Sequence, residues 1–569
     1  MRAFFRVMLV GAAVWAAGSF FPATAHACGG FFCNSAQPVN QAAEGIIFAD
    51  NGDGTTTAVI QIQYQGPSQN FSWLLPISSV PRSDEDIGVA SNLALQRLQS
   101  ATNPNYRLTV RVEGTCREYG GGSGCGSAQD EASFASGTTG PKVDPTGPEV
   151  VVEASGVVGA FEWSVISLDK TLPDPAQAAQ DWLKANGYDV PSGAPALLGP
   201  YLKQGLFLLA LRLTKGADAG SIRPIVLTYS GSQPSIPVKL TAVAANDDMG
   251  VLTWLLGKSR AVPANYLSLE LNEARINWFN AASNYNSVVI DAANDAGGQG
   301  FVTELAGPTS VLAAQIWTLA DESKWSNLQQ ATSLTGTAFF QTALQLFGQW
   351  DGFWDATRAA VSLTDGQTFE AIKACPACYA IQVSPANYLA QLDKLVVEPV
   401  KRVQQLIDAH PQITRLYTTL SADEMTLDPL FSFNPALPNL SNLHTAERVI
   451  ACNPGVYESD APWHIALPQG GVVWGTANEA ATGTWPSELN ALPPNRLIVR
   501  AADSGEGKVV EDNSAAIEND LAHYNSGKSA PASAGGGCAA GRGRSSGAWL
   551  AAAALGVALI RRRQRLQRR

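Results

Sequence analysis

Residues 45–76, GIIFADNGDGTTTAVIQIQYQGPSQNFSWLLP, carry the pattern that decides the fold class. From Ile60 to Gln65, apolar residues alternate with glutamines, which places apolar groups on one face of a strand and amides on the other. The turn Asp50–Gly54 separates this strand from the apolar run Ile46–Phe48, so the two runs predict a β-hairpin. We therefore expect an N-terminal region of antiparallel strands.

Outward from the hairpin, alternation predicts further strands at 107–113, 207–213, 222–229, 236–243 and 251–256. A helix is expected after Asp174, which can cap free amides, with Pro175 at the first helical position. Beyond about residue 310 the pattern turns helical, and a well-marked helix begins at Ser384. These elements predict an α+β fold, in which a β-rich, sandwich-like domain of antiparallel strands precedes a mixed, largely helical domain.

The chain has 569 residues, which is long enough for several domains. Composition shifts set the expected divisions. These are a signal peptide at 1–27, a β-rich domain at 28–270 with a Gly- and Pro-rich loop at 119–148, a mixed helical domain at 271–502, a flexible tether at 503–537 and a C-terminal tag at 538–569.

The N-terminus has the ingredients of a secretory signal peptide. Arg2 and Arg6 precede an apolar stretch from Val7 to Phe21, and Ala25-His26-Ala27 supplies small residues before Cys28. We expect the export machinery to engage this segment and signal peptidase to cut after Ala27. Lipidation of Cys28 is the alternative, although Ala25 and His26 stand where lipoprotein sites usually have leucine and a small residue.

The C-terminus has the pattern of a second targeting signal. Gly537-Cys538 is followed by an apolar segment, Ala548–Ile560, and then by Arg561, Arg562 and Arg563. At about 1.5 Å per residue this segment spans about 20 Å, against about 30 Å for the hydrocarbon core, so it is a marginal anchor. The positive-inside rule keeps the arginines in the cytosol and the preceding body outside.

This arrangement resembles the MYXO-CTERM sorting tag. The resemblance implies that a sorting protease cuts near Cys538 and that a lipid on this cysteine attaches the protein to the membrane at the cell surface. An unprocessed transmembrane helix is the alternative. Either outcome puts the body outside the inner membrane.

Charge is uneven along the chain. The sequence has 38 Lys and Arg against 49 Asp and Glu, a net charge of −11. Ten of the basic residues lie before Cys28 or after Cys538, where there are no acids, so the body is strongly acidic. Such a body repels phosphate backbones, which argues against a role in nucleic-acid binding.

Seven cysteines remain in the body when Cys538 is set aside. Two pairs close in sequence, Cys28 with Cys33 and Cys116 with Cys125, are plausible disulfides in an oxidising compartment. The remaining three could pair in several ways, and one thiol is left over.

Cys375-Pro376-Ala377-Cys378 has the spacing of a thiol redox pair. Such pairs normally follow a core strand and an aromatic residue, whereas Lys373 and Ala374 precede this one. A structural disulfide is therefore favoured over redox or metal chemistry. A zinc site would need two more ligands from Cys452, His444 and His464.

The sequence predicts no catalytic or cofactor-binding residue. Its histidines form no metalloprotease motif, nucleophile-elbow and phosphate-loop motifs do not occur, and no dinucleotide fingerprint lies between a strand and a helix. Asp50 and Asp53 could offer oxygens to Ca²⁺, but a plain hairpin turn is favoured. We expect Asp247-Asp248 to be a solvated turn and Asp423-Glu424 to begin a helix, with a metal or acid–base role as the alternative. Stacking of tryptophans on a glycan is an alternative to burial, but a core position is favoured for four of them: Trp278, Trp325, Trp350 and Trp354.

Five segments resemble the bacterial exported family called domain of unknown function 2330. They are the segments at 28–33 (CGGFFC), 73–76 (WLLP), 181–188 (DWLKANGY), 223–229 (RPIVLTY) and 424–429 (EMTLDP). The likeness spans most of residues 28–440. The resemblance implies no catalytic or binding residues.

The leading hypothesis is an exported, surface-anchored envelope protein with a binding or structural role. The first alternative is an extracytoplasmic hydrolase acting on envelope polymer or peptide. It would need a cleft in which two carboxylates converge, or in which His444, His464 and a carboxylate do. The second alternative is a thiol oxidoreductase that uses Cys375.

Overall fold

The computed structural model describes residues 40–65, 72–82, 86–117, 150–169, 171–188, 190, 193–214, 222–242, 245–364, 366–475, 477–526 and 528. Strands and helices both occur throughout, with more strand in the N-terminal region and more helix in the C-terminal half, which confirms the α+β class.

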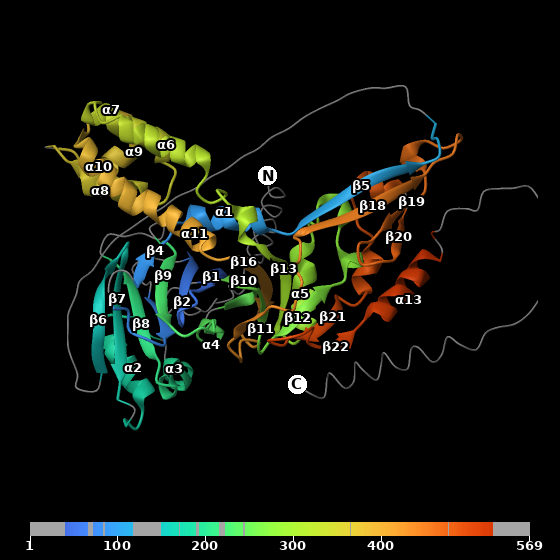
Figure 1. The fold of residues 1–569 in the computed structure, drawn as a ribbon, viewed down its shortest axis with the longest axis horizontal. Coiled ribbons are helices and arrows are strands. Elements are labelled where there is room, and N and C mark those ends of the chain that lie inside the picture. The colour runs from blue at the N-terminus through green and yellow to red at the C-terminus, as the bar shows by residue number, and fades with distance from the viewer. Residues whose placement is uncertain are drawn as a thin grey trace, which may run out of the picture. The chain divides into compact units, whose positions relative to one another are not determined.

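A ten-stranded mixed sheet forms the centre of the fold (Figure 1). Its order is β22-β21-β12-β13-β16-β10-β1-β2-β9-β4. The expected hairpin is β1 and β2, which pair antiparallel, while β1 pairs parallel with β10. The strands are β1 (Asn40–Asp50), β2 (Thr55–Gln65), β4 (Ile87–Val89), β9 (Ile225–Ser230), β10 (Ala245–Gly257), β12 (Leu267–Leu271), β13 (Gly300–Pro308), β16 (Gln412–Leu420), β21 (Asn495–Arg500) and β22 (Lys508–Asp512).

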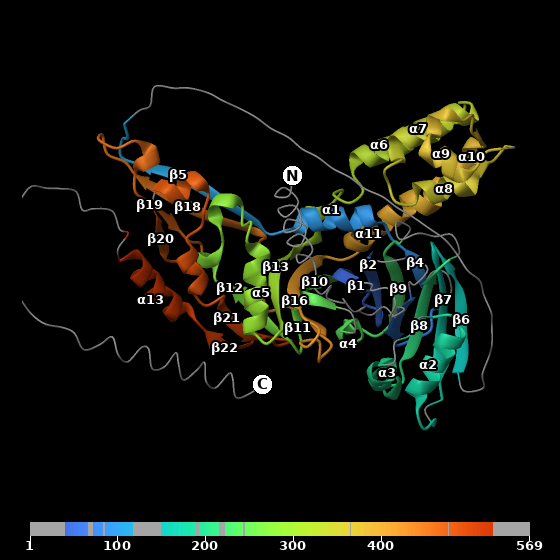
Figure 2. The same ribbon diagram turned by 180° about the vertical axis from the view of Figure 1, so that it is seen from behind.

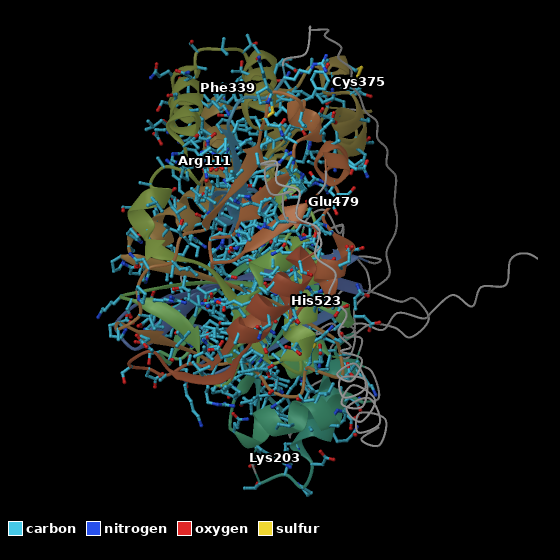
Figure 3. The ribbon with its side chains drawn as sticks, turned by 90° about the vertical axis from the view of Figure 1, so that its right-hand side faces the viewer. Arg111, Lys203, Phe339, Cys375, Glu479 and His523 are labelled. Carbon is cyan, nitrogen blue, oxygen red and sulfur yellow. A yellow bond between two sulfur atoms is a disulfide. The ribbon has the colours of Figure 1, made fainter. Side chains whose placement is uncertain are left out.

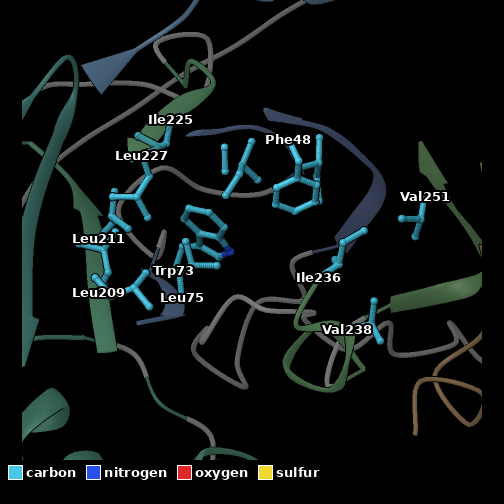
Figure 4. Packing of buried hydrophobic residues seen from close by; sticks show 14 of the residues in the cluster. Phe48, Trp73, Leu75, Leu209, Leu211, Ile225, Leu227, Ile236, Val238 and Val251 are labelled. Atoms are coloured by element: carbon cyan, nitrogen blue, oxygen red, sulfur yellow. The ribbon is translucent and has the colours of Figure 1, made fainter. Parts of the chain in front are cut away.

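A second, four-stranded sheet packs on the ten-stranded one. It runs β3 (Ser72–Ile77), β8 (Phe207–Leu213), β7 (Phe161–Leu168) and β6 (Val150–Val158). Alternate side chains of both sheets, including Phe48, Trp73, Leu211 and Leu227, share one core (Figure 4). The opposite side chains of β3 and β8 pack under α2 (Pro175–Ala185) and α3 (Ala194–Lys203).

Helices cover the other face of the ten-stranded sheet. Ile47, Val59 and Trp254 pack against α1 (Asn92–Thr102) and α11 (Glu398–Asp408). The π-helical segment η7 (Asp393–Val397) joins α11 to a helical cluster, which both ribbon views show as one group (Figures 1 and 2). The cluster comprises α6 (Leu319–Gln330), α7 (Gly336–Phe347), α8 (Phe353–Ala360), α9 (Phe369–Ala374) and α10 (Pro385–Leu392), with the short strands β14 (Val361–Ser362) and β15 (Gln382–Val383).

A third sheet continues from α1. Its strands are β20 (Val472–Gly475), β19 (Trp463–Ala466), β18 (Leu443–Ala451) and β5 (Asn105–Glu113), and β5 runs parallel to β18. It shares a core with the last strands of the ten-stranded sheet and with η3 (Glu273–Arg275), η4 (Trp278–Asn280), α5 (Tyr285–Asp295) and α13 (Ser514–Asn525). The remaining elements are α4 (Val238–Thr241), α12 (Ala477–Thr482), η5 (Thr309–Leu312), η6 (Pro376–Cys378), η8 (Glu458–Asp460), η9 (Ser487–Ala491), and a ribbon of β11 (Arg260–Pro263) with β17 (Phe431–Asn434).

Three expectations differ from the structure. The stretch 236–243, predicted to be a strand, contains α4, which begins just after Pro237. The tether predicted at 503–537 contains β22, which pairs with β21, and α13, which buries Ile517 and Leu521. The boundary predicted at residue 270 falls inside β12, because strands from both sides of it share the ten-stranded sheet.

The tryptophans expected in the core pack as predicted, since Trp278 and Trp325 are buried and Trp350 and Trp354 pack against the helical core. Among the described residues, no helix is both long and apolar enough to cross a bilayer. The predicted signal peptide, the loop at 119–148 and the tag from Cys538 lie outside the described residues.

Candidate functional site

A cavity of about 300 Å³ opens beside the C-terminal end of α1, where β5, α5 and the strands β10, β13 and β16 meet. We call it the tyrosine cavity, because three of its lining residues are tyrosines. Its lining residues are Gln99, Asn103, Pro104, Tyr106, Leu252, Ala281, Ala282, Tyr285, Asn286, Glu304, Arg415 and Tyr417.

A buried ion pair forms one wall of the tyrosine cavity. Glu304 is the extra residue where the register of β13 against β16 shifts between Thr303 and Leu305, and such a bulge re-aims its side chain. Arg415 Nε donates a hydrogen bond to Glu304 Oε2, and the two side chains are 5% and 1% exposed. The guanidinium therefore neutralises the carboxylate inside the protein.

Further hydrogen bonds hold this pair in place. Arg415 Nη1 donates to the Gln99 carbonyl oxygen at 3.0 Å and to Thr102 Oγ1 at 2.9 Å, which ties it to the end of α1. Tyr285 donates its hydroxyl proton to Glu304 Oε1 at 2.6 Å. Each charged group therefore has at least one hydrogen-bond partner in addition to its counterion.

The three tyrosines stay protonated at neutral pH. Burial, followed by the charges of Glu273 and Glu304, raises the pKa of Tyr106 well above its usual value. Burial and then the Glu304 charge raise the pKa of Tyr285 likewise, and they raise the pKa of Tyr417 to about 12. These phenols can donate and accept hydrogen bonds but do not supply a phenolate nucleophile or base.

A strained turn borders the tyrosine cavity. Ala281 and Ala282 have φ of 41° and 60°, a left-handed conformation that non-glycine residues adopt rarely. The Asn277 side chain holds the preceding turn by accepting hydrogen bonds from the amides of Phe279 and Asn280. Strain of this kind concentrates at functional sites, where surrounding contacts maintain it.

The lining is suited to binding rather than to acid–base chemistry. Its described residues include a single carboxylate, which Arg415 neutralises, and no histidine or cysteine. Within the described ranges, no three side chains of His, Cys, Asp or Glu lie close enough together to hold a metal ion.

The two histidines proposed for a hydrolase do not converge. His444 donates from Nδ1 to Glu273 Oε1 at 2.5 Å and stacks on Tyr106, which lines the tyrosine cavity. His464 lies on β19 opposite Val449, five residues along β18 from His444, and packs against Trp474.

The structure pairs Cys116 with Cys452 rather than with Cys125, which corrects the expectation. The physical reason is the parallel pairing of β5 with β18, in which Glu113 lies beside Ala451. The residues that follow these two strand ends bring Cys116 and Cys452 to a Cα–Cα distance of 4.7 Å. Residues Cys28, Cys33 and Cys125 lie outside the described residues.

Cys375 and Cys378 form the second disulfide. Cys375 directly follows α9, and Cys378 lies in the three-residue turn η6. Figure 3 shows Cys375 at the same end of the molecule as Phe339 of α7. A redox thiol is normally activated at the beginning of a helix, whereas Cys375 follows the last residue of α9 and precedes only the three-residue turn η6.

The acidic pairs hold turns. Asp53 Oδ1 accepts hydrogen bonds from the Thr55 amide and hydroxyl, which lower the pKa of Asp53, and Asp50 Oδ1 accepts one from the Gly52 amide. Calcium binding there stays a prediction. Ser421 links the two acidic pairs, because its hydroxyl accepts a hydrogen bond from the Asp248 amide at 3.0 Å and its amide donates one to Glu424 Oε2 at 2.8 Å. Burial raises the pKa of Glu424, and the charges of Asp423 and Asp248 raise it further.

Sequence reasoning missed the tyrosine cavity. Its two charged residues did leave a signal, since Glu304 and Arg415 are isolated charges within otherwise apolar or uncharged strands. The tyrosines and Asn286 left none, because they come from separate segments.

The segments that carried the family resemblance are largely structural. Trp73, Trp182, Leu183 and Leu227 are buried core residues. Asp428 accepts hydrogen bonds from the Tyr201 hydroxyl at 2.7 Å and from the Lys239 amide at 3.0 Å, so it joins α3 and α4 to the following loop.

Fold and site together define an α+β protein with a mixed central sheet and a neutral, tyrosine-lined cavity. The chain belongs to the family described as "Uncharacterized protein conserved in bacteria (DUF2330)", whose model matches residues 22–318. The match therefore covers most of the tyrosine cavity, while Arg415, Tyr417 and the segment 424–429 lie beyond it.

No curated protein matches the chain. Among solved structures, a mutated baculovirus P35 after caspase cleavage is similar at 12% identity and a TM-score of 0.22, over 40% of this chain and 76% of that one. That similarity is too weak to inform fold or function.

Proposed function

We propose that this protein is exported, is held at the cell surface, and binds a small polar molecule in the tyrosine cavity. The tyrosine cavity carries the proposal, because it joins a preformed hollow with several polar groups, as ligand sites do. Its charges are already neutralised by each other, and its phenols are protonated. Binding therefore fits this lining better than proton transfer or nucleophilic attack.

Cysteine pairing supports export. The Cys116–Cys452 disulfide joins residues 336 positions apart, and structural disulfides of this kind persist in oxidising compartments outside the cytosol. The apolar, arginine-led N-terminus that ends at Ala27 supplies the corresponding address. On this proposal, the export machinery and signal peptidase are the first partners of the chain.

The C-terminal sequence supports attachment at the surface. Gly537-Cys538, the short apolar segment and Arg561–Arg563 together suit cleavage by a sorting protease and membrane attachment through Cys538. The strongly acidic body is compatible with a soluble domain outside the membrane.

Mass spectrometry of the native protein from fractionated cells tests this proposal. We expect a mature chain that begins at Cys28, lacks the residues after Cys538, carries a lipid on that cysteine and is found in the surface fraction. A Cys538→Ala variant should be lost from that fraction, whereas Ser533→Ala, in the same stretch, should not. An unprocessed chain in the cytosol with reduced Cys116 and Cys452 would refute the proposal.

A further inference from the structure

Some polar atoms of the tyrosine cavity have hydrogen-bond partners within the protein and others do not. Tyr417 donates its proton to Asn286 Oδ1 at 2.7 Å, which leaves the Tyr417 oxygen as an acceptor beside the Asn286 amide nitrogen, a donor. Among the described residues, neither that nitrogen nor the Tyr106 hydroxyl has a hydrogen-bond partner. Tyr106 is 7% exposed, so its hydroxyl is available only to something inside the cavity.

A donor beside an acceptor is the pattern that a hydroxyl group satisfies. A hydroxyl of a ligand can donate to the Tyr417 oxygen while accepting from the Asn286 amide. A second hydroxyl or carbonyl oxygen can accept from Tyr106. Several hydroxyls on one small molecule would therefore find matched partners.

The described lining residues carry no unpaired charge. Glu304 and Arg415 are the only ionised side chains among its described residues, and they pair with each other. A charged ligand would lose its hydration without gaining a counterion. This disfavours carboxylates, phosphates, amines and zwitterions.

The size and surface of the cavity narrow the class further. A volume of about 300 Å³ is at the small end of ligand sites. Three of the lining residues are tyrosines, whose side chains combine an apolar ring with a polar hydroxyl. A ring that carries hydroxyls at its edge and C–H groups on its faces complements such a lining.

We infer that the tyrosine cavity binds a neutral sugar residue. This inference rests on the proposed binding role and names its ligand class. The Asn286–Tyr417 pair recognises one sugar hydroxyl, and Tyr106 binds a further oxygen. The buried Glu304–Arg415 pair positions Tyr285 and the end of α1 around the ligand.

Saturation-transfer NMR and calorimetry on the native protein test the inference. The probes are galactose and N-acetylglucosamine, with glucuronate and glucosamine as charged counterparts and cyclohexanol as an apolar one. We expect the neutral sugars to bind and the counterparts to bind at least tenfold more weakly. Asn286→Ala and Tyr417→Phe should each weaken sugar binding about tenfold, since each removes a hydrogen-bonding group.

Asn294→Ala is the matched control, because Asn294 is exposed on the same helix and does not line the cavity. It should bind sugar like the unaltered protein, and the thermal unfolding midpoints of all variants should agree within a few degrees. Preferential binding of a charged or apolar probe that the cavity variants abolish would overturn the sugar assignment and keep the binding role. If no probe binds, or if binding ignores both cavity substitutions, the sugar assignment and the binding role both fail, whereas surface location is decided separately by fractionation.

Discussion

Replacing Glu304 by glutamine should lower the free energy of unfolding by about 3–5 kcal/mol. The carboxylate side chain is 1% exposed and is the counterion of Arg415, which is 5% exposed. Glutamine keeps the size of the side chain and can still accept the Tyr285 hydrogen bond, but it leaves the guanidinium buried without a counterion. That uncompensated charge accounts for the magnitude.

The partner substitution and the double variant complete a cycle. Arg415→Met leaves Glu304 unpaired and removes the hydrogen bonds to Gln99 and Thr102, so a similar loss of about 3–5 kcal/mol is expected. Independent effects would add to about 6–10 kcal/mol. Because the double variant leaves no buried charge, we expect it to lose no more than either single variant, which is a coupling of at least about 3 kcal/mol.

Urea unfolding, followed by tryptophan fluorescence, measures these losses. The matched control is the ion pair of Arg496 with Glu270, whose side chains are 30% and 40% exposed and 2.7 Å apart. Glu270→Gln should cost less than about 1 kcal/mol, because water screens that pair. Equal losses for Glu304→Gln and Glu270→Gln, or a double variant whose loss is the sum of the single losses, would refute the reasoning.

Three further outcomes follow from the described contacts. Cys116→Ser with Cys452→Ser should lower unfolding stability by about 2–5 kcal/mol in urea, and reductant should then have no added effect at this bond. Burial lowers the pKa of His464 below the value of 6.5 that it has in the unfolded chain. The free energy of unfolding should therefore be highest above pH 6.5 and should fall as acid protonates this histidine. His464→Phe should flatten that pH dependence, and an unchanged pH dependence would show that His464 does not cause it. Because the pKa of Glu424 is raised, its ionisation costs stability above its unfolded value of 4.5, and Glu424→Gln should gain a few tenths of a kcal/mol at pH 7 but nothing at pH 3, as thermal melts at both pH values would show.

Local signals predicted local elements well. Asp174 accepts a hydrogen bond from the Gln177 amide and Pro175 begins α2, as the cap pattern indicated. The strand expected at 207–213 is β8 with the same bounds. In both cases, residues within a few positions of each other determine the conformation.

Distant partners decided what the sequence did not predict. The stretch 503–525 looks polar enough for a linker, yet β21 supplies the neighbour that makes β22 a strand, and the third sheet supplies a core for α13. Cys116 found Cys452 rather than Cys125 because β5 pairs with β18. The tyrosine cavity draws residues from α1 to β16, so no single window of sequence contains it.

The parallel pairing of β1 with β10 also governs the order of assembly. One edge of β1 can pair with β2 at once, but its other edge has to wait for residues 245–257 to be synthesised, and the strand beyond them arrives only at 412–420. Such a high contact order slows folding and keeps apolar strands exposed meanwhile. The central sheet therefore cannot place β16 beside β10 until residue 420, about three quarters of the way along the chain, has been synthesised.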